Sequence, residues 1–85
     1  MEKREIISFL RCPAADLVDF AVKSANLTRN ERAAIELCAR QALTQERAAE
    51  EIDVSVDAVQ KWYGSGMRKL DKAWSGNWWI TKLAQ

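Results

Sequence analysis

Residues 43–70 read LTQERAAEEIDVSVDAVQKWYGSGMRKL, and this stretch decides the fold. Thr44 is a good capping residue for a first helix. After it, apolar residues recur at helical spacing, namely Ala48, Ala49 and Ile52. Asp53 and Val54 interrupt this pattern, and Ser55 is the next capping residue. The stretch therefore predicts a short helix, a tight turn and a longer helix, which is the skeleton of a helix-turn-helix.

The longer helix carries an apolar stripe whose members recur every three or four residues. They are Val59, Trp62 or Tyr63, Met67, Leu70 and Trp74. Val54 precedes the cap and is placed to pack on Val59 as a hydrophobic staple. The short helix has a small residue, Ala49, where the two helices are expected to cross closely. We expect the stripe to face the core and the opposite side of the helix to face solvent.

Residues 27–39, LTRNERAAIELCA, predict a further helix that begins with a capping box of Thr28 and Glu31. Its apolar side is expected from Ala34, Ile35, Leu37 and Cys38. The fold class is therefore all-α, as a small helical domain with a helix-turn-helix core, N-terminal helices and a Trp-rich C-terminal segment. The parts of this single domain are the extension at 1–26, the core at 27–72 and the tail at 73–85.

The two ends of the chain are expected to pack on this core. Residues 1–26 predict two amphipathic helices, one over 2–10 and one that begins at Pro13 and runs to about Ser24. The tail contributes three indoles, Trp74, Trp78 and Trp79. They form a candidate surface for self-association, since Trp is enriched at interfaces. The other interpretation is that they complete the core, which we favour for Trp74.

From residue 27 to residue 70 the chain resembles the helix-turn-helix domain of the LuxR-type response regulators and the related region 4 of bacterial sigma factors. The residues that carry the resemblance are Leu27-Thr28, Glu31, Ile35, Leu37, Ala39, Leu43-Thr44, Ala49, Ile52, Val54-Ser55, Val59 and Lys69-Leu70. The chain departs from the pattern at residues 40–42, a longer loop without the usual glycine. It also places Gly64 and Gly66 inside the second helix, each costing about 1 kcal/mol relative to Ala. The resemblance implies duplex DNA binding, transcription regulation of bacterial or phage type, and a homodimer.

The outer face of the longer helix carries the candidate DNA-binding residues, because a recognition helix reads the major groove with its N-terminal exposed side chains. Gln60 suits adenine and Lys61 suits guanine. By the resemblance, base reading falls on Gln60, Lys61 and Gly64, of which the last has no side chain. The helix starts are expected to hold phosphate, as are Arg68 and Lys69 farther along. The full set is Thr44, Gln45, Ser55, Val56, Asp57, Gln60, Lys61, Gly64, Arg68 and Lys69.

Composition excludes other classes of protein. The chain has no His and only two Cys, which excludes a Cys/His zinc finger and His-based catalysis. We therefore expect a non-enzyme without metal or cofactor, and a cytoplasmic protein, because no apolar run approaches a membrane span. The net charge of +1 is low for a DNA-binding module. It favours the alternative function, a protein-interaction module on a helix-turn-helix scaffold that contacts RNA polymerase, a partner regulator or a phage packaging component.

Overall fold

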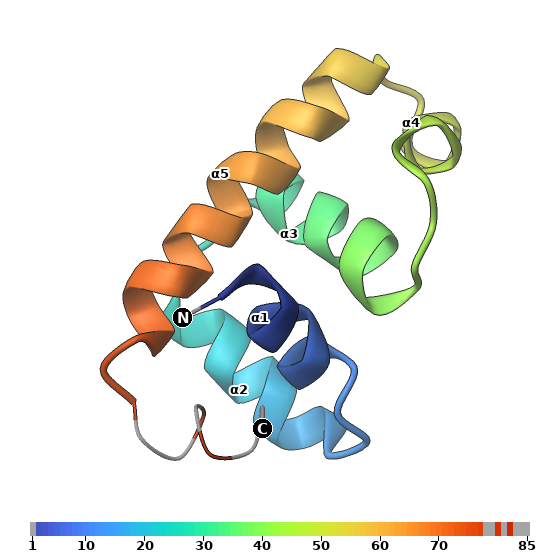
Figure 1. Ribbon diagram of the computed structural model, residues 1–85. Helices are drawn as coiled ribbons and strands as arrows, with labels where there is room; N and C mark the ends of the chain where they lie inside the picture. Colours follow the sequence, from blue (N-terminus) through green and yellow to red (C-terminus); the bar gives the residue numbers. More distant parts are fainter. Residues whose placement is uncertain (1, 78–79, 81, 83–85) are drawn as a thin grey trace.

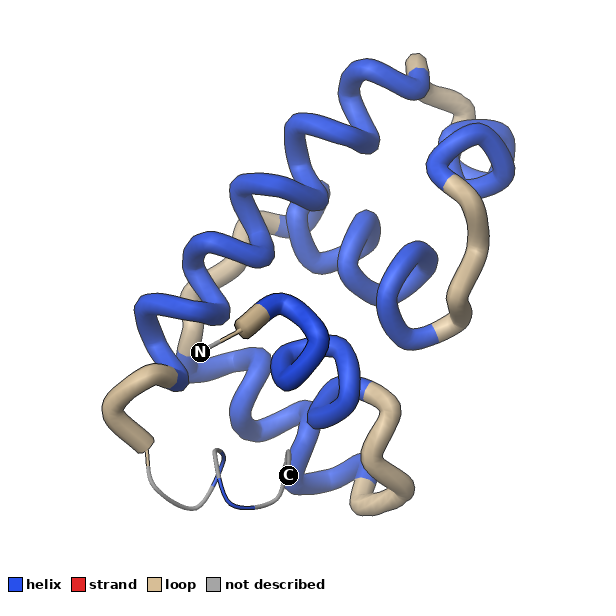
Figure 2. The backbone as a smooth tube through the Cα atoms, viewed as in Figure 1, coloured by secondary structure: helices blue, strands red, loops and turns tan. Residues whose placement is uncertain are grey.

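The computed structural model describes residues 2–77, 80 and 82. Figure 1 shows that this part of the chain folds into helices packed around the long C-terminal one. The helices are α1 (Lys3–Leu10), α2 (Ala15–Ser24), α3 (Arg29–Ile35), α4 (Gln45–Ile52) and α5 (Val56–Trp74), with a π-helical turn η1 (Glu36–Arg40) that continues α3. Figure 2 shows no strand in the described residues. The all-α prediction is confirmed.

Three helices begin at caps that the sequence predicts. The Thr28 hydroxyl oxygen accepts from the Glu31 N–H at 3.2 Å, and the Thr28 N–H donates to the Glu31 carboxylate at 2.8 Å, which completes the capping box. Thr44 caps α4 by accepting from Arg47 N–H at 3.1 Å. Ser55 caps α5 by accepting from the N–H three residues on, also at 3.1 Å. These bonds satisfy backbone donors that a helix start leaves free.

Two predicted helix bounds are corrected. The second helix begins at Ala15 rather than Pro13, because the Pro13 carbonyl accepts from the Ala15 N–H at 2.9 Å and closes a turn ahead of the helix. The helix predicted over 27–39 is α-helical only to Ile35 and then widens, with the Gln41 N–H donating to the Glu36 carbonyl at 3.0 Å. This wider turn leads into the longer loop without glycine, where Ala42 adopts a φ of 58°.

The larger of two core clusters joins α1 and α2 to the C-terminal half of α5 (Figure 1). Trp74 is its largest side chain and is fully buried. Its indole N–H donates to the Ala21 carbonyl at 3.0 Å, and the Phe9 ring meets it edge-on at a centroid distance of 5.0 Å. Trp74 thus lies in the core, as favoured above, and is not available to a surface for self-association. Trp78 and Trp79, the rest of that prediction, lie outside the described residues.

The smaller cluster holds α4 against α3 and the N-terminal half of α5. Its buried members are Ala34, Ala48, Ala49 and Val59. Three alanines bring the helix backbones close together, as expected for Ala49, which is only 4% exposed. Gly66 extends the same principle along α5, because a Cβ there would lie 3.0 Å from Cγ1 of Ile35 on α3. The glycine that only weakens an isolated helix therefore permits the approach of α5 to α3.

Candidate nucleic-acid interface

The outer face of α5 presents most of the candidate DNA-binding side chains to solvent. Its exposed members are Val56, Asp57, Gln60, Lys61 and Arg68. The buried members of the same helix are Val59, Gly66, Met67, Leu70 and Trp74. By the helical period Lys61 and Arg68 lie opposite this buried side, whereas Gln60 lies at its edge, close in angle to Met67. Gln60 and Lys61 are both exposed. The placement opposite the apolar stripe expected from the sequence holds for Lys61, but Gln60 lies at the edge of the stripe.

The starts of α4 and α5 hold the other polar candidates. Thr44 and Ser55 are exposed, and each uses its hydroxyl oxygen as a cap acceptor while the O–H remains a donor. Gln45, the first residue of α4, is half-buried. Both starts carry the positive end of a helix dipole, which favours a nearby anion. The geometry is thus suited to phosphate at either start.

Gly64 and Arg68 lie one turn apart on the outer face. A Cβ at Gly64 would meet only the Arg68 guanidinium, at 3.6 Å, so the arginine lies over the glycine. A shallow hollow of about 250 Å³ beside them is lined in part by Lys3 of α1, whose ammonium lies 5.4 Å from the centre of the Tyr63 ring. Lys3 therefore adds a cation beside the outer face. Sequence reasoning missed it, because nothing in the local spacing places α1 along α5.

Lys69 differs from the other candidates, because the structure pairs its ammonium with Glu31 of α3. The Glu31 side chain is buried, with an exposed fraction of 5%, and its Oε1 accepts from Lys69 Nζ at 2.7 Å. Ser65 Oγ donates to the other carboxylate oxygen. Burial by itself would raise the pKa of Glu31, but the bonds from Lys69, Ser65 and Thr28 outweigh it and lower the pKa to about 2. The Lys69 ammonium thus has a partner within the fold, where its charge stabilises a buried carboxylate, and phosphate contact at Lys69 stays a prediction.

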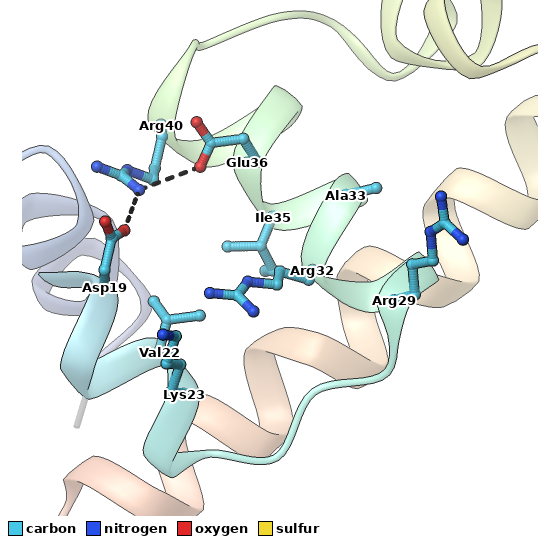
Figure 3. Close-up of a pocket in the computed structure, with 9 residues that line it drawn as sticks. All are labelled: Asp19, Val22, Lys23, Arg29, Arg32, Ala33, Ile35, Glu36 and Arg40. Carbon is cyan, nitrogen blue, oxygen red and sulfur yellow. Dashed lines mark hydrogen bonds and ion pairs between the residues drawn. The ribbon is translucent and has the colours of Figure 1, made fainter.

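A second cationic surface lies between α2 and α3, around a hollow of about 640 Å³. Figure 3 shows Arg40 bridging Asp19 and Glu36, at 3.0 and 3.2 Å. The side chains of Lys23 and Arg32 also line this hollow, and neither makes an ion pair or hydrogen bond within residues 2–77, 80 and 82. On α3, Ile35 both lines this hollow and faces Gly66 of α5, so the hollow adjoins the contact between α3 and α5. The two cationic surfaces belong to different helices, the first to α1 and α5 and the second to α2, α3 and η1.

The two cysteines are free and half-buried. Burial raises the pKa of the Cys38 thiol, which keeps it in the unreactive protonated form. Within the described ranges no group of three His, Cys, Asp or Glu side chains is placed to hold a metal ion. No described helix is both long enough and apolar enough to cross a bilayer.

Comparisons of the chain with protein-family models, with curated proteins and with solved structures gave no match.

Proposed function

We propose that the protein binds duplex DNA through the N-terminal half of α5 and acts as a transcription regulator of bacterial or phage type. The observation that carries the proposal is the outward placement of Gln60 and Lys61 near the start of a long helix. The buried alanines of α3 and α4 pack closely with Val59 of this helix and give it a rigid support. An exposed, rigidly held helix start with an amide and an ammonium is suited to the major groove.

Each group then has a separate task. The Gln60 amide pairs with adenine and the Lys61 ammonium donates to guanine. The hydroxyls of Thr44 and Ser55 donate to phosphate and set the register of the helix on the duplex. Arg68 lies seven residues beyond Lys61, about 10 Å farther along the axis, where it meets the sugar-phosphate backbone instead of base edges.

The experiment is a selected-site binding assay followed by salt titration on random duplex. The double substitution Gln60→Ala, Lys61→Ala should leave folding within about 0.5 kcal/mol of wild type and remove sequence preference, since a good base contact contributes roughly 1–3 kcal/mol. Arg68→Ala should weaken binding to all sequences and flatten the salt slope by about one contact. Arg32→Ala is the matched control, because it removes the same charge from an exposed position on α3, outside the proposed recognition helix. A wild-type chain with no preferred site and no salt-dependent affinity contradicts the proposal.

The second candidate function is a protein-interaction module, and the hollow between α2 and α3 favours it. Val22 and Ile35 give this hollow an apolar lining, while Lys23 and Arg32 stand beside it without internal partners among the described residues. Such a surface suits an acidic, partly apolar segment of RNA polymerase, a partner regulator or a phage packaging component. Failure of the salt titration on duplex, with a folded chain, would make this the better account.

A further inference from the structure

The outer face of α2 exposes apolar side chains that the proposed DNA interface does not use. Phe20 is 67% exposed and Leu17 is 47% exposed, one helical turn apart. Exposed apolar side chains that lie next to one another are a mark of interaction sites on soluble proteins. The ring projects from the N-terminal part of the chain, whereas the candidate DNA-binding side chains lie on α4 and α5.

Two further features of α2 indicate what covers this surface. A hollow of about 450 Å³, lined by residues 13–17, lies beside Leu17 at the start of the helix. Opposite charges stand at the two ends of the helix, with Asp16 in its first turn and Lys23 in its last. Both are exposed, and neither side chain has an ion-pair or hydrogen-bond partner in the part of the chain that the structure describes. Asp19, by contrast, is already paired with Arg40.

We propose that α2 pairs with α2 of a second copy of this chain in antiparallel orientation. Phe20 of each copy lies against Leu17 of the other and enters the hollow beside it. Lys23, three residues farther along, then comes level with residue 14 of the other copy, within reach of its Asp16. The two-fold axis repeats both contacts, so each apolar anchor and each charge has a partner.

Charge is the reason for choosing a second copy over an unrelated partner. In the antiparallel pairing both unpaired charges of α2 meet their opposites, whereas a parallel pairing would set Asp16 against Asp16 and Lys23 against Lys23. The helix is therefore complementary to itself in one orientation. If the proposed function also holds, a two-fold pair presents two recognition helices and reads an inverted repeat. Association itself requires no DNA, so the two proposals fail separately.

The first experiment is sedimentation equilibrium of the full chain over a wide concentration range, without DNA. We expect a reversible monomer–dimer equilibrium for wild type. Phe20→Ser should weaken association roughly tenfold or more, since central aromatic anchors carry much of the binding energy. Val56→Ser is the matched control, because Val56 is an exposed apolar residue on α5, and it should leave association unchanged. Circular dichroism checks that each variant is folded.

A charge exchange tests the orientation. Asp16→Lys and Lys23→Asp should each weaken association, because each sets like charges together across the two-fold axis. The double variant restores both pairs in reverse and should regain most of the wild-type affinity. A wild-type chain that stays monomeric at every concentration overturns the proposal. So does a dimer that Phe20→Ser leaves intact, or a double variant no better than the single ones.

Discussion

Glu31 should make the stability of this fold depend on pH in a window below neutrality. Its pKa is about 2 in the folded chain, against an ordinary value of 4.5. A difference of about 2.5 units corresponds to roughly 3 kcal/mol, at about 1.4 kcal/mol for each unit. The side chain is almost entirely buried, so little of this is lost to solvent screening. Since small domains are stable by only about 5–15 kcal/mol, the effect is large.

The sign follows from proton binding. Between the folded and the unfolded pKa, the unfolded state binds the proton and the folded state does not, so acid favours unfolding. The contribution of Glu31 is therefore fully present above its unfolded pKa of 4.5 and is lost as the pH falls to about 2. Glu31→Gln has no carboxylate to protonate and lacks this dependence. It should be less stable than wild type by roughly 2–3 kcal/mol at neutral pH.

Urea unfolding of both chains, from neutral pH to about 2, is the assay. The difference in free energy of unfolding should shrink toward zero as the pH falls, whatever other carboxylates contribute to both curves. Glu46→Gln, an exposed carboxylate in the first turn of α4, is the control and should follow wild type. Parallel curves for wild type and Glu31→Gln would refute the reasoning, because Glu31 would then lack a lowered pKa.

Substitutions at four further positions test the packing and the caps. Ala49→Leu should overfill the smaller cluster and cost about 1–3 kcal/mol, and an unchanged melting midpoint would mean that the helices do not meet there. Ser55→Ala should lower the free energy of unfolding by roughly 1 kcal/mol in chemical denaturation, and Ser55→Gly by less. If Ser55→Ala is as stable as wild type, Ser55 does not stabilise the start of α5 as its cap. Gly66→Ala should destabilise by roughly 1 kcal/mol, because its Cβ meets Ile35 at 3.0 Å, whereas Gly64→Ala should stabilise by a similar amount. If both glycine variants are more stable than wild type, Ile35 of α3 moves away from the added Cβ at residue 66 without loss of stability.

The sequence by itself determined the local structure. The caps at Thr28, Thr44 and Ser55, the buried stripe of α5 and the all-α class followed from bonds and spacings within about four residues. Such features need no knowledge of the rest of the fold, because a helix satisfies its backbone locally. The outward placement of Lys61 belongs with them, since it is opposite the same stripe, whereas the exposure of Gln60 at the edge of the stripe does not follow from the period alone. DNA binding by these residues remains a prediction.

Only the tertiary structure decided the partners that lie far apart in the chain. Lys69 has the spacing of an exposed phosphate contact, yet its charge is held by Glu31, 38 residues earlier. Gly66 is a weak residue for an isolated helix and a needed one where α5 approaches Ile35. Phe20 has the amphipathic surroundings of a core residue and is exposed. In each case the outcome depends on how one helix crosses another, which the packing of the whole chain sets and no local pattern encodes.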